Sequence, residues 1–235
     1  MKIKGPLTDA AFLERPNRFL TMVKIDGGRE ESHLPDPGRL KELLVPGARI
    51  RVRRASDGSL LTRKTRWTTV MVKAGSHWVS IDSTLPNRFV KWLLDRGDLP
   101  MFRGWGLVRT EVPYGRHRFD FLLEKEGRLL YLEVKSVTLV EGGVGMFPDA
   151  VTQRGSRQMA ALADLVRSGV DSGVLFVCQR GDVELFRPQW DRDPGFARAL
   201  VEAEKTGVKV WAISAEVTGT AIRFKNEIPC DLTPF

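Results

Sequence analysis

The stretch Arg116–Ser136, RHRFDFLLEKEGRLLYLEVKS, is the part of the sequence that decides the fold of the second half of the chain. Two strand-like runs, HRFDFLLEK and RLLYLEVKS, meet at Glu126-Gly127, a dipeptide suited to a two-residue hairpin turn. A turn at that point places Asp120 directly opposite Glu133, and directly opposed residues share a face of the sheet. Lys135 lies two residues beyond Glu133, so strand alternation puts it on the same face. The sequence therefore predicts two carboxylates and a lysine together at the end of an apolar hairpin.

That trio has the residue types needed for metal-assisted phosphodiester hydrolysis. Carboxylate oxygens are hard ligands suited to Mg²⁺ or Mn²⁺, and two facing carboxylates would repel each other without a cation between them. We therefore interpret Asp120 and Glu133 as metal ligands, with the backbone carbonyl of Val134 as a further ligand. Lys135 can orient or activate a water, or offset charge on the phosphate. The alternative is that the Glu-x-Lys pattern is ordinary polarity on the surface of a strand.

The charge of the chain is unevenly distributed. The net charge is +8, and residues 1–82 contain 16 lysines and arginines against 9 aspartates and glutamates. Residues 83–235 contain 21 against 20, so nearly all the excess positive charge lies in the first third. A one-sided basic surface favours a polyanionic partner, although basic residues can also serve solubility alone.

A row of arginines in the first third is the main candidate for contacting that partner. Arg49, Arg51 and Arg53 alternate with aliphatic residues, which predicts that all three lie on one face of a strand. Trp67 or Trp78 can offer a stacking face nearby, although tryptophans more often belong to the core. The further basic candidates for this nucleic-acid-binding surface are Arg39, Arg63, Lys64 and Arg66.

The first eighty residues consist of short strand-like runs broken by proline, glycine and aspartate. The expected strands are 19–25, 48–53, 68–73 and 77–81, with a short helical turn over 37–44. Several short strands with little helix favour a small antiparallel barrel, and an OB-fold-like barrel is the form we expect.

From Thr84 onward the pattern changes to a mixture of helices and strands. The expected order is a helix over 84–97, strands over 107–113, 118–124 and 129–137, a helix over 152–167, a strand over 174–179, a helix over 194–206 and a strand over 208–213. This order predicts a mixed sheet flanked by helices, and therefore an α/β (α+β) protein. We expect two domains, residues 1–82 and 83–235.

Several residues of the second domain are supporting candidates. Arg154 and Gln158 stand at i and i+4 of the expected helix, so one polar face can point back at the carboxylates and contact nucleic acid. Asp149 is either a third acidic contributor or, the interpretation we favour, a turn or capping residue. The segment Gly142–Gly145 lacks the spacing of a phosphate-binding loop and is expected to be a flexible connection.

Five longer strings carry a resemblance to a known family: RPNRFL (15–20), HLPDPGRLKELLVPG (33–47), RFDFLL (118–123), YLEVKSVTL (131–139) and FPDAVTQRG (147–155). Together and in this order they resemble the sugar fermentation stimulation protein A (SfsA) family, and the Asp…Glu-x-Lys hairpin resembles the PD-(D/E)xK nuclease superfamily. The resemblance implies an OB-fold-like domain followed by a nuclease-like domain, and DNA binding linked to sugar (maltose) metabolism. Two positions depart from it. The family usually has Lys-His where this chain has Arg157-Gln158, and related nucleases often have a glutamate where this chain has Asn87.

The leading hypothesis is a DNA-binding protein that acts as a Mg²⁺- or Mn²⁺-dependent nuclease through Asp120, Glu133 and Lys135. The intact trio favours it, whereas Asn87 favours the alternative of a non-enzymatic DNA-binding regulator that retains the nuclease scaffold. An RNA-processing factor is a third reading, because a basic barrel does not by itself choose DNA or RNA. With only two cysteines, no signal-like N-terminus and no membrane-length apolar run, we expect a cytoplasmic protein with no membrane contact. The sequence defines no oligomeric state.

Overall fold

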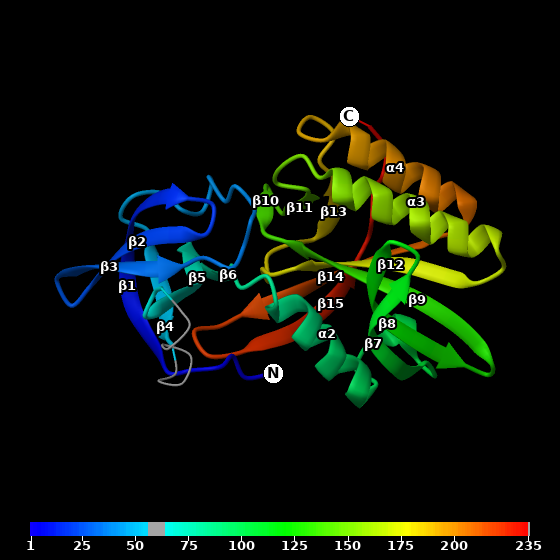
Figure 1. The fold of residues 1–235 in the computed structure, drawn as a ribbon, viewed down its shortest axis with the longest axis horizontal. Helices are drawn as coiled ribbons and strands as arrows, with labels where there is room; N and C mark the ends of the chain where they lie inside the picture. Colours follow the sequence, from blue (N-terminus) through cyan, green and yellow to red (C-terminus); the bar gives the residue numbers. More distant parts are fainter. Residues whose placement is uncertain (56–63, 235) are drawn as a thin grey trace.

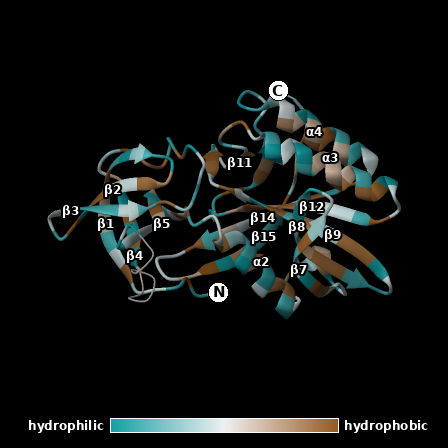
Figure 2. Ribbon diagram, viewed as in Figure 1, coloured by the Kyte–Doolittle hydropathy of each residue, from teal (hydrophilic) through white to brown (hydrophobic). Residues whose placement is uncertain are grey.

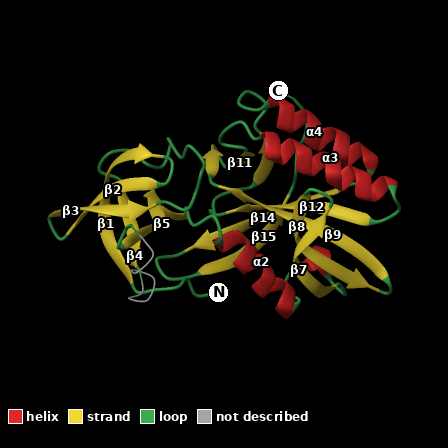
Figure 3. Cartoon of the chain, in the orientation of Figure 1, coloured by secondary structure: helices red, strands yellow, loops and turns green. Residues whose placement is uncertain are grey.

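The structure is a computed structural model that describes residues 1–55 and 64–234. Strands dominate both halves of the described chain, and its α-helices follow residue 84 (Figure 3). The strands are β1 (Leu7–Asn17), β2 (Leu20–Ile25), β3 (Gly28–His33), β4 (Arg49–Arg54), β5 (Trp67–Ala74), β6 (His77–Ser80), β7 (Gly106–Tyr114), β8 (His117–Lys125), β9 (Arg128–Val137), β10 (Leu139–Glu141), β11 (Val144–Phe147), β12 (Asp171–Cys178), β13 (Leu185–Pro188), β14 (Lys209–Val217) and β15 (Ile222–Ile228). The helices are α2 (Leu85–Arg96), α3 (Gln153–Arg167), α4 (Pro194–Thr206) and the 3-10 helix η1 (Pro100–Phe102).

The first half forms a closed five-stranded barrel (Figure 1). β1 pairs with β2 and β4, β2 pairs with β3, and β4 pairs with β5, all antiparallel. A short parallel pairing of β3 with β5, Ser32 with Trp67 and His33 with Thr68, closes the circle. The barrel interior is filled by buried side chains that include Phe12, Val23 and Ile50. This arrangement confirms the expected OB-fold-like barrel.

The sequence patterns missed two of the barrel strands, β1 and β3, and predicted one turn wrongly. β3 reads GREESH and has no apolar alternation; its backbone is ordered as a strand by pairing with β2 and β5. The helical turn expected over 37–44 is a hydrogen-bonded turn instead, because Leu40 has φ +50°, outside the helical region. Its backbone is held by Arg15, whose guanidinium donates to the carbonyls of Gly38 and Arg39, each over 2.7 Å.

The second half is a mixed sheet with helices on both faces (Figure 1). Its strand order is β7-β8-β9-β12-β14, antiparallel through β9 and parallel from β9 to β14. Alternation along β12 divides the core: Leu175 and Val177 pack with α2, whereas Val174 and Phe176 pack with α3 and α4. Figure 2 shows the hydrophobic stretches of β9 and β14 that result from cover on both faces. The mixed sheet flanked by helices is confirmed.

The hairpin that anchors this sheet has the predicted register. Lys125 pairs with Arg128 and Phe121 with Leu132, as a two-residue loop at Glu126-Gly127 requires. Glu126 has φ +52° and Gly127 has φ +79°, the two positive angles of a type I′ hairpin turn. The register therefore brings Asp120 and Glu133 to the point where β8 and β9 begin to separate.

The segment Gly142–Gly145, expected to be a flexible connection, forms a tight hairpin turn and the start of β11. Gly142 and Gly143, with φ +54° and +81°, form the turn of the β10–β11 hairpin. Gly145 lies within β11, where an added Cβ would meet the Cys178 sulfur at 2.8 Å. The expectation failed because glycine-rich sequence is compatible with both a loop and a tight hairpin, and only packing against β12 selects the hairpin.

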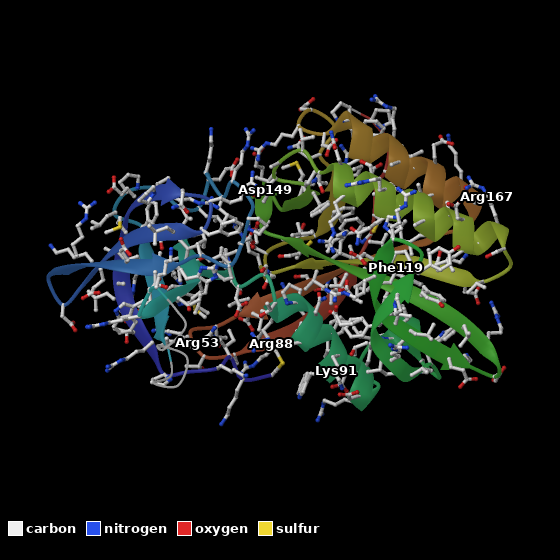
Figure 4. The ribbon with its side chains drawn as sticks, viewed as in Figure 1. Arg53, Arg88, Lys91, Phe119, Asp149 and Arg167 are labelled. Carbon is white, nitrogen blue, oxygen red and sulfur yellow. The ribbon has the colours of Figure 1, made fainter. Side chains whose placement is uncertain are left out.

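The two halves are tied together by polar contacts as well as by strand pairing. β6 meets β14 at the single pair Trp78–Val217. Asp149, at the meeting point of the halves in Figure 4, accepts a hydrogen bond from the backbone N–H of Leu40 over 3.2 Å. Asp149 thus links the second half to the barrel and is not a third member of the carboxylate cluster. Buried Asp82 accepts from Arg88 over 3.1 Å and lies 3.6 Å from Arg53.

Candidate metal and nucleic-acid site

Asp120 is held in a fixed orientation at the fork between β8 and β9. Its Oδ2 accepts a hydrogen bond of 2.7 Å from the backbone N–H of Val134. Its Oδ1 accepts one of 2.5 Å from the side-chain amide of Asn87 on α2. Asn87 therefore contacts the Asp120 carboxylate directly. A neutral amide at this position positions Asp120 and adds no negative charge.

Glu133, Lys135 and Gln158 form a closed triangle beside Asp120. The Lys135 ammonium donates to Glu133 Oε1 over 2.7 Å and to Gln158 Oε1 over 2.6 Å. The Gln158 amide donates to the same Glu133 oxygen over 2.6 Å. Glu133 and Gln158 are buried, while 12% of the Lys135 side chain is exposed. Each side chain of the triangle is therefore fixed by the other two.

The start of α3 positions Gln158. Thr152 caps the helix by accepting from the backbone N–H of Gly155, and Thr152 N–H donates to Asp193, which also caps α4. Gly155 allows the two helices to approach closely, because a Cβ there would lie 3.0 Å from Phe196. Packing of α3 against α4 and the sheet therefore sets where Gln158 meets Glu133.

Burial is the main electrostatic influence on Asp120. Burial first and the neighbouring Glu133 carboxylate second raise the pKa of the Asp120 carboxyl, which reaches about 7. The Val134 N–H, Lys135 and Asn87 act in the opposite direction and lower the pKa. An acid with this pKa sits at the balance between two protonation states near neutrality, and a cation at the site would favour the charged state.

One buried carboxylate oxygen of this site is suited to bind a divalent cation. Glu133 Oε2 is buried and has no hydrogen-bond partner within residues 1–55 and 64–234. A buried carboxylate oxygen without a partner is costly, and a hard cation would satisfy it. The same ranges contain no cluster of three or more histidine, cysteine, aspartate or glutamate side chains arranged around one point. Asp120, Glu133 and the Val134 carbonyl are thus the groups available to hold an ion, with water or substrate completing the shell.

A basic cleft of about 700 Å³ opens next to this pair. Gln158 forms part of its wall, so the cleft reaches the residue that contacts Glu133 and Lys135. The other lining residues come from the β7–β8 turn and the start of α3, and they are Gly115, Arg116, His117, Arg118, Arg154 and Arg157. Four arginines around one cleft make it a place where a phosphate backbone could lie.

The predicted arginine row of β4 has other partners in the structure. Arg49 and Arg51 donate to Asp9, and Arg51 also donates to the carbonyl of Gly219 over 2.7 Å. Both guanidinium groups lie over the Trp78 ring, at 5.7 and 4.9 Å from its centre. These contacts hold the barrel against the second half and occupy the face of Trp78.

The other predicted basic residues divide between the two halves. Arg39 is exposed beside the turn that precedes β4, and Lys64 and Arg66 are exposed ahead of β5. Arg63 lies outside the described residues. Arg154 lines the cleft near the carboxylates, as the helical spacing of Arg154 and Gln158 indicated.

Sequence reasoning missed three groups that the fold places at the cleft: Arg116, Arg118 and Arg157. Arg116 and Arg118 flank the start of β8, and a basic turn two residues ahead of Asp120 was a signal that could have found them. Arg157 follows Arg154 by three residues on α3, the spacing that places two side chains on neighbouring parts of one helix surface.

The fold is thus an OB-fold barrel joined to a mixed sheet that carries a carboxylate pair where β8 and β9 separate. Two family models match the chain: "SfsA N-terminal OB domain" over residues 13–81 and "Sugar fermentation stimulation protein RE domain" over residues 84–221. The chain belongs to the sugar fermentation stimulation protein (SfsA) family.

Relatives of full length and a solved structure agree with that assignment. The sugar fermentation stimulation protein homolog of Acetivibrio thermocellus is 43% identical over 232 residues, covering 97% of this chain and 98% of the relative. The homolog of Shouchella clausii is 44% identical, covering 95% and 97%. The structure of Pyrococcus furiosus SfsA in complex with Ca²⁺ matches with a TM-score of 0.89 at 28% identity, covering 98% of each chain. Within the described residues, the helices are all too short or too polar to cross a membrane.

Proposed function

We propose that this protein binds nucleic acid and hydrolyses phosphodiester bonds with a divalent cation held by Asp120 and Glu133. The observation that carries the proposal is the buried Glu133 Oε2 beside Asp120, which has no hydrogen-bond partner in the described part of the chain. The large majority of buried polar side-chain atoms in folded proteins have a hydrogen-bond partner, so a buried carboxylate oxygen without one favours a bound ligand. The structure of the Pyrococcus furiosus relative contains Ca²⁺, which supports a cation site in the family.

The side chains of the site have separate roles in this proposal. A bound Mg²⁺ or Mn²⁺ would stabilise charge on the phosphate oxygens and make a bound water more acidic. Val134 N–H and Asn87 hold Asp120 in the orientation that a ligand needs. The Lys135 ammonium, fixed by Glu133 and Gln158, can orient a water or offset charge on the phosphate.

The basic cleft supports nucleic acid as the substrate. Arg116, Arg118, Arg154 and Arg157 gather positive charge next to the carboxylates, where a negatively charged pair would otherwise repel a phosphate. Arg118 is itself paired with exposed Glu111 over 2.6 Å, and such an exposed ion pair is weak enough to give way to a phosphate.

A second candidate function is supported by Asn87. With an amide where related nucleases carry a glutamate, the site has two acidic groups, and the chain could bind DNA as a regulator without cutting it. Family membership is compatible with both functions, and so is the basic cleft.

A cleavage assay with Mg²⁺ or Mn²⁺ against single-stranded, duplex and branched DNA and against RNA separates the two. We expect cleavage by the wild type and loss of cleavage, by on the order of 100-fold or more, in Asp120→Asn and Lys135→Ala. Asp95→Asn on exposed helix α2 is the matched control and should cut like the wild type. Binding measured in EDTA should persist in all variants. A wild type that binds DNA but cuts none of these substrates with either metal would establish the regulator instead.

A further inference from the structure

A second hollow, of about 450 Å³, lies on the barrel and is lined by residues far in the sequence from the carboxylates. Phe19, between β1 and β2, lines it together with Asn17 from the end of β1, His33 from the end of β3, and Lys64 from the segment before β5. The loops between the first two and the last two barrel strands are where OB folds commonly hold oligonucleotides. The hollow therefore lies where this architecture can accept a ligand.

Phe19 is unusual because its backbone is fixed while its ring is exposed. Its N–H donates to the side chain of Asn17 over 2.9 Å, and its carbonyl accepts from Leu34 N–H over 2.9 Å. The residue is nevertheless 51% exposed. Because its backbone is already held, only the Phe19 side chain has to be ordered when a flat partner stacks on the ring, which lowers the entropic cost of binding.

A basic hollow of about 390 Å³ shares one lining residue, Asn17, with the first one. Arg18, Arg39 and Lys41 are exposed around it, and Val151 of the second half forms its far wall. The described lining contains no carboxylate. A row of exposed cations next to an aromatic ring suits a ligand with alternating phosphates and bases.

The row also leads toward the carboxylate pair. Val151 lies just before the N-cap of α3, Arg154 is the second residue of the helix, and Gln158 lies about one turn farther on. Arg154 and Gln158 line the cleft beside Glu133. At about 1.5 Å per residue, the four residues from Arg154 to Gln158 advance roughly 6 Å along the helix.

We propose that the nucleic acid bound by this protein is single-stranded, with one base stacked on Phe19 and its backbone passing Arg18, Arg39 and Lys41 toward Arg154 and the carboxylate pair. This inference rests on the proposed function and adds the substrate class. A single strand is required because a base inside a duplex has both faces covered by its neighbours and cannot stack on a side chain. Glu31, the carboxylate at the Phe19 hollow, can accept from an amino group of the base.

The test is equilibrium binding in EDTA, where no cleavage can occur, using fluorescently labelled oligo-dT and oligo-U of about 15 nucleotides and a duplex of the same length. Phe19→Ala should weaken single-strand binding roughly 10-fold or more and change duplex binding less than about twofold. Phe19→Tyr keeps the ring and should bind like the wild type. Val108→Ala, which shortens another exposed apolar side chain, is the matched control. The stronger of the dT and U signals identifies DNA or RNA.

Photo-crosslinking gives a measurement that needs no variant. An oligonucleotide carrying 5-iodouracil should crosslink to the wild-type peptide that contains Phe19. Unchanged single-strand affinity in Phe19→Ala, an equal loss for the duplex, or crosslinks confined to other peptides would each overturn the inference. If the wild type cuts nucleic acid but Phe19→Ala binds normally, this inference fails while the nuclease proposal stands. If Phe19 is needed for binding but nothing is cut, the binding mode stands and the nuclease proposal fails.

Discussion

Replacing Asp120 with asparagine should change how the stability of the metal-free protein depends on pH. The folded state raises the pKa of Asp120 from 3.8 to about 7. Between these values the folded protein keeps a proton that the unfolded chain has already released, so the free energy of unfolding falls as pH rises. The contribution is fully present below about pH 4 and is lost as pH passes through about 7. Asparagine does not titrate, so the free energy of unfolding of the Asp120→Asn variant lacks this decrease with pH.

The size of the effect follows from the same shift. Between pH 5 and pH 8 the proton on Asp120 is lost over about two pH units, and each unit is worth about 1.4 kcal/mol. The free energy of unfolding of Asp120→Asn minus that of the wild type should therefore rise by about 2–3 kcal/mol from pH 5 to pH 8 in EDTA. For a chain of this length that equals roughly 5–10 °C in melting temperature.

Thermal unfolding followed by circular dichroism at both pH values measures this difference. Any constant cost of the substitution, such as a weakened bond to Val134, cancels when the two pH values are compared. Asp95→Asn, an exposed exchange of the same kind, should give a difference that does not change with pH. Saturating Mg²⁺ should stabilise the wild type, by about 2.7 kcal/mol at 100 times the dissociation constant, and should stabilise Asp120→Asn much less. If the free energy of unfolding of the variant minus that of the wild type stays constant or falls from pH 5 to pH 8, burial does not raise the pKa of Asp120.

Two further predictions concern the cleft and the core. The double change Arg154→Glu and Arg157→Glu should weaken nucleic-acid binding and lower the slope of log affinity against log salt by roughly 1–2. Arg198→Glu, at an exposed position of α4, should change neither the affinity nor the slope. Equal effects in both proteins would argue against the cleft as the phosphate site. Gly173→Ala in β12 should lower the free energy of unfolding by about 1–3 kcal/mol, because a Cβ there would lie 2.4 Å from the Trp211 ring and 2.9 Å from the Lys209 carbonyl. Gly106→Ala in β7 is the control, because a Cβ there would lie 3.8 Å from the Glu124 carbonyl, and urea unfolding of both variants shows whether the close approach matters.

Local pattern was a good guide wherever one face or one stripe of an element is apolar. The helix over 194–206 and the strands of the Asp120 hairpin lie where the sequence predicted them, because their periodicity matches the burial they have in the fold. β15, which reads IRFKNEI, was missed, as were β10, β11 and β13. These segments are short or largely polar, and their strand structure depends on a neighbour: β15 pairs with β14, and β13 pairs with β11.

The candidate site divides in the same way. The register of one hairpin is a local property, set by a two-residue turn, so the sequence alone determined that Asp120, Glu133 and Lys135 gather at one strand fork. The contacts that complete the site come from residues far away in the chain. Asn87 reaches Asp120 from α2, and Gln158 reaches Glu133 from α3.

The arginines show the limit of sequence reasoning most clearly. The alternation of Arg49, Arg51 and Arg53 determined that they share a face of β4, but it could not determine what lies against that face. The tertiary structure places Asp9, Trp78 and Gly219 there, and it assembles the cleft by the carboxylates from Arg116, Arg118, Arg154 and Arg157 on two separate elements. Periodicity along one strand or helix fixes the direction of a side chain, whereas its partner is fixed only when distant segments pack together.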